Sequence, residues 1–314
     1  MKLEISVIIP VYNAIRFLEK AVLSAVNQDE VIEVLVIDDG STDGSYELLQ
    51  ELEQKHHKVK LLLHPEHINK GRSATRNLGI TSASGNLIAF LDSDDYFLEN
   101  RFKNDIHVLN KYPDSDGVYN AVGFEIHDAS KSNLSQVQKL YTVNQVVEPD
   151  VLFEGLVAGK VGHFQINGLT VKRSLFYKTG LFNEELQVAE DSDIFWKMAM
   201  KGRLYTGKID EAVAIRGVHE YNSFYQVYLY DKYIYTMYDS LISWSSRNKV
   251  PLKRIDLLLK AIWILKHKKE EGLVDEIRFW AKQFWGNHRI IFSYLFIKYF
   301  PIVRRRKLLF PFLK

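Results

Sequence analysis

The sequence predicts an α/β fold in which a mostly parallel, doubly wound sheet is flanked by helices. Short apolar runs, each suited to a strand buried on both faces, alternate with segments of helical periodicity in the first hundred residues. The connections between them are short, which favours parallel strands joined by crossover helices. Carboxylates follow two of the apolar runs, at the strand ends where open α/β sheets bind their ligands.

The first half of the chain alternates strands and helices in order. Asn13 is expected to cap the first helix, in which Leu18, Ala21, Val22 and Ala25 share one face. The predicted strands and helices in this half are Ile5–Pro10, Ala14–Gln28, Glu33–Ile37, Ser45–Gln54, Val59–Leu63, a helix entered through Lys70–Gly79, and Leu87–Leu91.

The middle of the chain continues with weaker periodicity. Acids in the first turn of a helix and a glycine after its last turn mark a helix over Ala189–Gly202. The other predicted helices and strands here are Glu99–Asn110, Gly117–Ile126, Pro149–Gly155, Ile166–Val171 and Ala212–Ile215.

The last third has a different character. Two further helices are predicted over Leu252–His267 and Leu273–Gly286. Tyrosines recur at helical spacing before them, a pattern typical of packing rather than of a ligand cage; they are Tyr225, Tyr228, Tyr235 and Tyr238. We therefore expect a C-terminal helical extension.

Composition narrows the class of protein. The 314 residues suffice for one large α/β domain with an appendage, and the 46% hydrophobic and 25% charged content is ordinary for a globular chain. The absence of cysteine excludes disulfides and thiolate metal sites and suits a reducing compartment. The N-terminus shows no signal-peptide pattern and no run of 18 apolar residues occurs, so a cytoplasmic protein is expected.

The net charge of +2 hides an asymmetry along the chain. Residues 221–314 hold 18 Lys and Arg against 7 Asp and Glu, whereas residues 1–220 hold 23 against 32. This difference predicts an acidic body over 1–220 and a basic, aromatic-rich helical region over 221–314, with different partners for the two surfaces.

The acidic stretch after Leu87–Leu91 is a candidate metal site. Asp92 and Asp94 are two residues apart, so in extended chain their side chains point to the same side, and Asp95 follows directly. Carboxylates this close repel one another unless a cation lies among them, and ligands that are all oxygen favour Mg²⁺ or Mn²⁺. The alternative is an acidic turn after a strand.

A second group of residues suits a nucleotide. Asp38 and Asp39 follow the second predicted strand and can accept hydrogen bonds from a base N–H and from ribose hydroxyls. Lys70, Arg72 and Arg76 bring positive charge to the same sheet edge. Both glycine-rich phosphate fingerprints are absent, so phosphate binding would depend on a metal and these cations.

The pair Glu190-Asp191 supplies a candidate general base. A sugar hydroxyl that attacks an anomeric carbon must lose its proton, and a positioned carboxylate can take it. The alternative is that these acids only cap the start of a helix.

Five segments taken together resemble the family 2 glycosyltransferases of GT-A fold, which have a Rossmann-like, mixed, mostly parallel sheet. The match holds in order and spacing; it is strong over roughly residues 4–100 and fair to about residue 223. The segments are Ile5–Asn13, Val36–Asp43, Lys70–Gly79, Gly85–Asp95 and Glu190–Asp191.

The resemblance implies an inverting, metal-dependent transfer of a sugar from a nucleotide sugar, with UDP as the expected nucleotide, to a saccharide or lipid-linked acceptor in glycan biosynthesis. It implies a nucleotide-binding half over 1–100 and an acceptor-binding half over 101–220. The nucleotide contacts it implies are Asp38, Asp39, Pro10, Tyr12, Asn13, Lys70, Arg76 and Ser93.

The same resemblance assigns the reacting groups. Asp92 and Asp94 form the metal and diphosphate site, and Asp191 is the catalytic base, with Glu190 supporting it or contacting the acceptor. His219 follows the last predicted strand, where related sequences often carry a histidine. It is expected either to touch the metal or diphosphate or to be an ordinary surface or packing residue.

The basic tail, which includes Arg304–Lys314, is typical of a peripheral contact with the inner face of the cell membrane. The alternative is a helical extension that packs on the body and has a solvated basic rim. The basic residues form no recognised nucleic-acid motif, so no nucleic-acid partner is expected.

Two other functions compete with the transferase. A nucleotidyltransferase would need a glycine-rich loop bearing Arg or Lys near the N-terminus, and Ile8–Asn13 has none. A non-catalytic nucleotide-sugar-binding module would be expected to have lost Asp92, Asp94 or Asp191, and all three are present.

Overall fold

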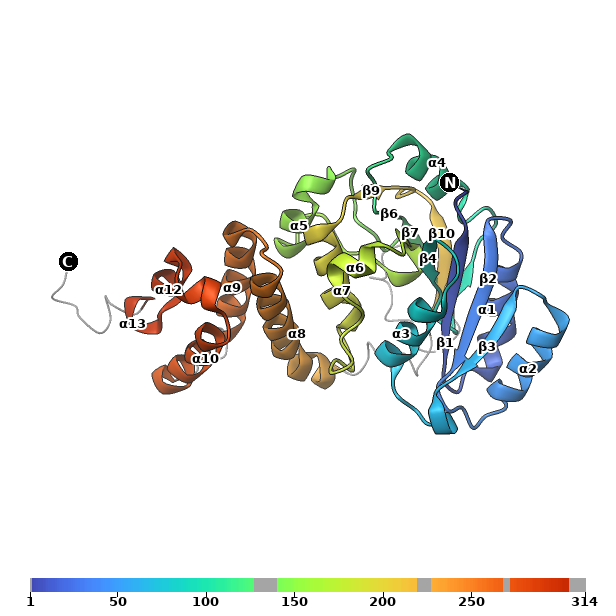
Figure 1. The fold of residues 1–314 in the computed structure, drawn as a ribbon, viewed down its shortest axis with the longest axis horizontal. Helices are drawn as coiled ribbons and strands as arrows, with labels where there is room; N and C mark the ends of the chain where they lie inside the picture. The colour runs from blue at the N-terminus through green and yellow to red at the C-terminus, as the bar shows by residue number, and fades with distance from the viewer. Residues whose placement is uncertain (1, 127–139, 219–226, 268–271, 305–314) are drawn as a thin grey trace. The chain divides into compact units, whose positions relative to one another are not determined.

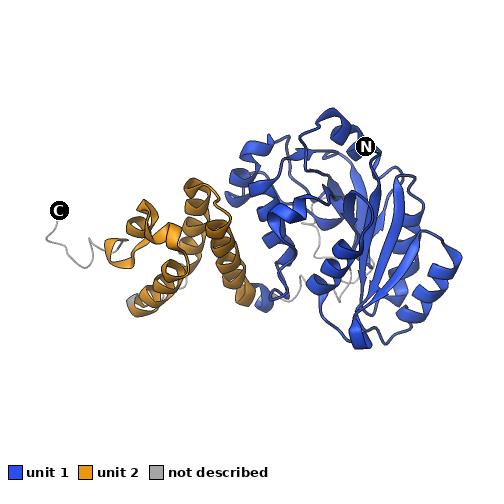
Figure 2. Cartoon of the chain, in the orientation of Figure 1, with its two compact units in different colours: residues 1–230 blue, residues 231–314 orange. Residues whose placement is uncertain are grey.

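The computed structural model describes residues 2–126, 140–218, 227–267 and 272–304 (Figure 1). The chain divides into two compact units, unit 1 (Met1–Tyr230) and unit 2 (Asp231–Lys314), which are coloured separately in Figure 2. The functional division predicted at residue 220, and the two halves predicted within 1–220, remain predictions.

The described part of unit 1 contains a mixed sheet of seven strands. The first four strands in spatial order are parallel, as predicted, and β8 then runs antiparallel to both of its neighbours. The order is β3 (Val59–Leu63), β2 (Val31–Asp38), β1 (Ile5–Val11), β4 (Leu87–Phe90), β8 (Leu169–Lys172), β6 (Gly117–Tyr119) and β9 (Leu204–Thr206). The predicted α/β class with a mixed, mostly parallel sheet is confirmed.

Helices cover both faces of this sheet (Figure 1). Alternate residues of β1, from Ile5 to Val11, belong to a hydrophobic core shared with α1, α2 and α4, because strand side chains alternate between the two faces. On the other face α3 lies so close to β1 that a Cβ built on Gly79 would be 2.5 Å from Ile8 Cγ2. The helices of unit 1 are α1 (Ile15–Val26), α2 (Ser45–Lys55), α3 (Arg72–Ser82), α4 (Lys103–Lys111), α5 (Pro149–Val157), α6 (Leu175–Thr179) and α7 (Glu190–Lys201).

A second sheet of three strands lies in the same unit. In it β10 (Ala212–Val218) pairs antiparallel with β5 (Tyr96–Phe97) and parallel with β7 (Ala121–Ile126). Because β5 begins one residue after Asp95, this sheet fixes the far end of the acidic stretch that follows β4.

Several predicted boundaries were wrong. The strand predicted over Gly117–Ile126 breaks at Asn120, whose side chain accepts from Lys208 N and donates to Asp105 and Gly168 O, so its halves join different sheets. The strand predicted from Ile166 starts at Leu169, after a 3₁₀ turn. The helix predicted from Glu99 starts at Lys103.

Unit 2 is helical, as predicted. Its core includes Trp280, which stacks on Tyr299 with ring centroids 5.4 Å apart. Tyr238 is buried as expected, but Tyr228 in unit 1 is 70% exposed, so the packing predicted for the tyrosine stripe is wrong there, and Tyr225 lies outside the described residues. The helices are α8 (Val227–Arg247), which continues from unit 1 into unit 2, α9 (Leu252–His267), α10 (Leu273–Trp285), α11 (His288–Ile291), α12 (Tyr294–Tyr299) and α13 (Pro301–Arg304).

No helix in the described part of the chain combines the length and the apolar character needed to cross a membrane.

Candidate active site

The carboxyl ends of β1 and β2 and the loop after β4 border a cleft of about 960 Å³. The parallel order of these strands explains the arrangement, because their carboxyl ends meet at one sheet edge. The predicted site residues that line the cleft are Pro10, Tyr12, Asn13, Asp39, Lys70, Asp92, Ser93 and Asp94. Four others are not among its lining residues: Asp38, Arg76, Glu190 and Asp191.

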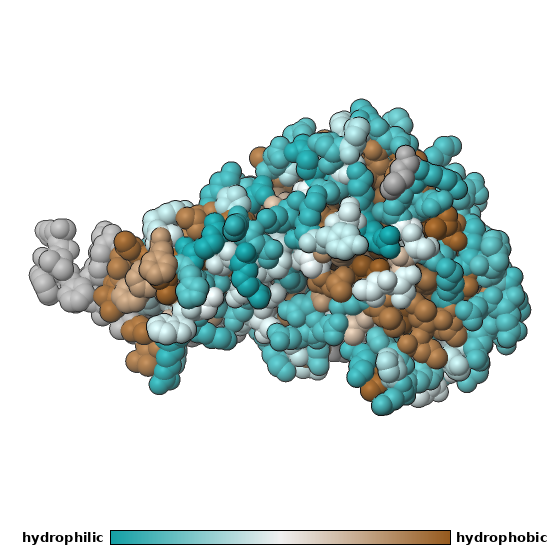
Figure 3. Space-filling model, viewed as in Figure 1, coloured by the Kyte–Doolittle hydropathy of each residue, from teal (hydrophilic) through white to brown (hydrophobic). Residues whose placement is uncertain are grey.

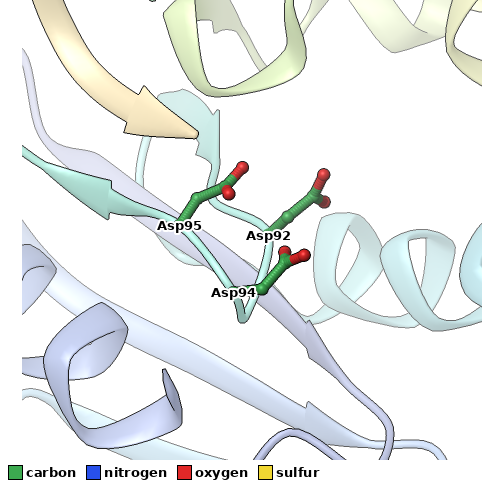
Figure 4. A group of neighbouring side chains, drawn as sticks. All are labelled: Asp92, Asp94 and Asp95. Carbon is green, nitrogen blue, oxygen red and sulfur yellow. The ribbon is translucent and has the colours of Figure 1, made fainter. Parts of the chain in front are cut away.

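The acidic loop (Asp92–Asp95) brings three carboxylates together. The nearest oxygens of Asp92, Asp94 and Asp95 all lie within 4.8 Å of one another, and Figure 4 shows the three side chains on one side of the loop. A tight turn produces this convergence, since Asp95 N donates to Asp92 O at 3.0 Å. Three oxygen ligands at this separation suit a hard divalent cation.

Asn167 holds the acidic loop in place. It is fully buried; its Oδ1 accepts from Asp92 N at 3.0 Å and its amide donates to Asp95 Oδ2. Gly217 N of β10 donates to the other oxygen of Asp95 at 2.8 Å. The prediction missed Asn167, because its partners are more than seventy residues away and no local pattern reveals the contact.

The pKa values of Asp92 and Asp95 in this loop are shifted in opposite directions. Burial acts to raise the pKa of Asp92, but the guanidiniums of Arg76, Arg72 and Arg216 outweigh it and hold that pKa below its usual value. Burial, reinforced by the charges of Asp94 and Asp92, raises the pKa of Asp95 well above its usual value. The loop therefore carries concentrated negative charge that a cation would relieve.

Asp38 and Asp39 hold the loops that follow β2 and β3, and of the two only Asp39 lines the cleft. Asp38 Oδ2 accepts from Gly40 N and Ser41 N, at 3.1 and 3.0 Å, and contacts His67 Nε2 at 2.6 Å. The oxygens of Asp39 accept from Lys70 N and Gly71 N, at 2.6 and 2.9 Å. The nucleotide contacts expected of both aspartates remain predictions.

The start of α1 differs from its prediction. Asn13 does not cap this helix; it has a positive φ of 53°, and its Oδ1 accepts from Thr42 N at 2.8 Å. The loop after β2 satisfies the first helical N–H instead, with Asp43 Oδ2 accepting from Ile15 N at 3.1 Å. Asp43 also lines the cleft and was not predicted as a site residue.

The helix α7 presents Glu190 and Asp191 in its first turn. Glu190 is buried, and its Oε1 accepts from Arg72 and Arg76 of α3, at 3.2 and 3.0 Å. Arg76 also donates to Asp92 Oδ1 at 2.7 Å. The structure thus links the acidic loop to the predicted base, although Asp191 does not itself line the cleft.

The pKa of Asp191 is raised above its usual value. Burial and the adjacent charge of Glu190 raise its pKa above the usual value, and the guanidiniums of Arg76 and Arg72 only partly oppose this. A higher pKa makes a carboxylate a stronger proton acceptor near neutral pH. Arg216 of β10 lines the cleft and was not predicted, whereas His219 lies outside the described residues.

A mixed, mostly parallel sheet flanked by helices, with an acidic loop at its strand ends beside a cleft lined by cations, is typical of a glycosyltransferase of GT-A fold. The chain belongs to glycosyl transferase family 2, whose sequence model matches residues 6–166.

The chain is similar to several bacterial proteins. It is 34% identical over 158 residues to glycosyltransferase GlyA of Streptococcus pneumoniae serotype 4, covering 46% of this chain and 22% of GlyA. It is 30% identical over 206 residues to the minor teichoic acid biosynthesis protein GgaA of Bacillus subtilis strain 168, covering 64% of this chain and 44% of GgaA. The chain thus spans less than half of the length of both relatives.

The fold is also similar to that of a solved structure. S. aureus TarS residues 1–349 in complex with UDP superpose with a TM-score of 0.59 at 20% sequence identity, covering 83% of this chain and 71% of that one.

Proposed function

We propose that this enzyme transfers a sugar from a UDP-sugar to a saccharide or lipid-linked saccharide acceptor, with inversion at the anomeric carbon and with Mg²⁺ or Mn²⁺ bound at the acidic loop. The observation that carries the proposal is the convergence of Asp92, Asp94 and Asp95 within 4.8 Å beside a cleft large enough for a nucleotide sugar. The cations Lys70 and Arg216 line the same cleft.

The residues of the acidic loop fit a divalent cation. All three candidate ligands are carboxylates, and burial, reinforced by the charges of Asp94 and Asp92, raises the pKa of Asp95. A divalent cation held there would stabilise the negative charge on a departing nucleoside diphosphate.

The proposed reaction is a single displacement. The acceptor hydroxyl attacks the anomeric carbon while Asp191 takes its proton. The new glycosidic C–O bond forms as the bond from the anomeric carbon to the diphosphate oxygen breaks, and the nucleoside diphosphate leaves with that electron pair. One displacement inverts the anomeric centre, so one base suffices, and the raised pKa of Asp191 suits it to this role.

The names of similar proteins support the ligand classes. One structure similar in fold was solved with UDP, and one sequence relative is named for minor teichoic acid biosynthesis. A glycan of the cell envelope is therefore the acceptor class that we propose.

Measuring UDP release from a panel of UDP-sugars, with Mn²⁺ and a mixture of saccharide acceptors, tests the proposal. We expect acceptor-dependent release with one or a few donors. We expect Asp191→Asn to lower kcat by about 10²–10⁴-fold while UDP affinity stays within about twofold, because a general base acts on the acceptor proton and not on donor binding. Unchanged turnover in this variant would reject Asp191 as the base.

We further propose that unit 2 contacts the anionic lipids on the inner face of the cell membrane. It exposes Trp285 at the end of α10 and Phe292 directly after α11, which are 85% and 87% accessible, together with Tyr294 and Ile297 of α12. Figure 3 shows apolar side chains on the face of unit 2 near the end of the described chain. Aromatic side chains combined with an excess of Lys and Arg suit an interface of anionic lipid.

Sedimentation with vesicles of phosphatidylglycerol and phosphatidylcholine tests this contact. We expect the variant Trp285→Ser/Phe292→Ser to reduce the bound fraction, whereas Tyr177→Ser, which removes an 88% exposed aromatic from unit 1, should leave binding unchanged. Equal binding of all three proteins, or no binding by the unmodified chain, would contradict the membrane contact.

A further inference from the structure

We propose that Arg76 is a positioning residue that joins the acidic loop to the helix carrying the catalytic base. This inference rests on the proposed function, because it concerns how the cation site and the base of that reaction are held together. It also replaces the phosphate contact expected of Arg76 from the sequence.

The burial of Arg76 argues against direct contact with a nucleotide. The residue is 1% exposed and is not among the residues that line the cleft, whereas Arg72, one turn earlier on α3, does line it. The ring of Phe182 lies 5.4 Å from the Arg76 guanidinium carbon and covers one side of the group.

Arg76 donates to two carboxylates that belong to different elements. One terminal nitrogen donates to Asp92 Oδ1 at 2.7 Å and the other donates to Glu190 Oε1 at 3.0 Å. Asp92 opens the acidic loop, and Glu190 precedes Asp191 in the first turn of α7. A single buried guanidinium therefore bridges the cation loop and the helix that carries the base.

The planar guanidinium suits this role better than an ammonium would. Its two terminal nitrogens lie in one plane and can bind two acceptors at once, whereas a lysine presents a single point charge. Without Arg76, Asp92 would lose a hydrogen-bonded cation. Of its two arginine partners, buried Glu190 would keep only Arg72. Both carboxylates would then be held less firmly in the geometry that transfer requires.

The electrostatic effects agree with this geometry. The Arg76 guanidinium is the foremost of the charges that lower the pKa of Asp92, and it also limits how far burial and Glu190 raise the pKa of Asp191. Arg76 thus acts on the cation ligand and on the base at once.

The test measures Mn²⁺ affinity and steady-state kinetics for Arg76→Met, Arg76→Lys and Glu190→Gln. Arg76→Met should weaken Mn²⁺ binding by about tenfold or more, as loss of groups that orient metal ligands does. It should also lower kcat by about 10²-fold, because a small misplacement of reacting groups is costly. Arg76→Lys should also show reduced Mn²⁺ affinity and reduced kcat.

Glu190→Gln tests the contact of Arg76 with Glu190 separately from its contact with Asp92. It should lower kcat more than it weakens Mn²⁺ binding, because Arg76 keeps its own hydrogen bond to Asp92 Oδ1 when Glu190 is neutralised. The matched control is Arg173→Met. It removes an arginine that donates to Ala83 O at the amino end of β4, opposite the end that borders the cleft, and should change neither Mn²⁺ affinity nor kcat.

Wild-type affinity and kcat in Arg76→Lys, or wild-type Mn²⁺ affinity in a folded Arg76→Met, would overturn the inference. If Arg76→Met does not fold, Arg76→Lys and Glu190→Gln decide the question. Failure of the proposed function would differ, since the unmodified enzyme would then show neither Mn²⁺ binding nor UDP release.

Discussion

At the scale of single residues, the site contains acids whose pKa values are shifted in opposite directions. The pKa of Asp92 is lowered by nearby guanidiniums, whereas burial and a like charge raise the pKa of Asp191. Opposite pKa shifts support the division of roles that we propose, with ionised Asp92 supplying charge and the more basic Asp191 taking the proton. Arg76 lies close enough to act on both.

The raised pKa of Asp191 predicts a cost to stability. An acid whose pKa is raised by folding is less stable ionised in the folded protein than in the unfolded chain. This cost is complete above the folded-state pKa and disappears as pH falls below the ordinary value of 3.8. Asp191→Asn should therefore raise the melting temperature at neutral pH, and the difference from wild type should vanish towards acid pH.

Thermal unfolding over a pH series measures this effect. The substitution retains an Oδ1 that can accept from Ser192 N, so no hydrogen bond need be lost. The control Asp210→Asn, at an exposed position, should leave the melting temperature unchanged. A lower melting temperature for Asp191→Asn at neutral pH would contradict this account, because it would show that the ionised carboxylate does not destabilise the folded protein.

The sequence could predict which residue types gather at the site but not which of them hold the others. Asp92, Asp94 and Asp39 line the cleft as expected, because strand ends and acidic motifs are local features. Asn167 and the bridge through Arg76 depend on contacts across 75 and 114 positions, and no periodicity reports such contacts. The roles of these site residues in catalysis remain predictions.

At the scale of elements, a buried glutamate ties the sheet to the turn before β4. Glu33 of β2 accepts from Ser6 of β1 at 2.6 Å and from the main-chain N–H and hydroxyl of Ser84, at 2.6 and 2.8 Å. Lys60 of β3 donates to its second oxygen. Burial acts to raise the pKa of Glu33, but these donors outweigh it and lower that pKa to about 2.

Glu33→Gln should therefore destabilise unit 1 by about 1–3 kcal/mol at neutral pH, because it removes an ionised acceptor from four donors. A lowered pKa stabilises the fold above the ordinary value of 4.5, and this contribution is lost as pH falls towards about 2. Denaturant unfolding at several pH values measures it.

The control for that experiment is Glu51→Gln, which removes an acid from an exposed pair with Lys55. It should change the free energy of unfolding by less than about 0.5 kcal/mol. A loss of stability at Glu33 no larger than at Glu51, or one that grows towards acid pH, would contradict the account of this link.

Element prediction succeeded where a long periodic segment or a buried apolar run occurred, as for α9 and β3. It failed for β5 and β9, whose two or three residues become strands only through their neighbours in the sheet. The break between β6 and β7 was missed because the apolar pattern continues through it; the buried contacts of Asn120 make the break.

At the scale of the whole molecule, two compact units carry opposite charge. Up to residue 220 the chain has an excess of acids, and beyond it an excess of bases. Unit 1 holds the cleft and belongs to a known family, so its class could be predicted from motifs in order. Unit 2 could be predicted only as helical, because its exposed aromatics form no motif with a defined ligand.

The central claim is that the acidic loop binds UDP through a divalent cation. Calorimetric titration of UDP into the protein, with and without Mn²⁺, tests it in wild type and in Asp94→Asn. We expect UDP to bind wild type with at least about tenfold higher affinity when Mn²⁺ is present, and Asp94→Asn to lose this dependence. Equal UDP affinity with and without Mn²⁺, or an undiminished Mn²⁺ effect in Asp94→Asn, would contradict the claim.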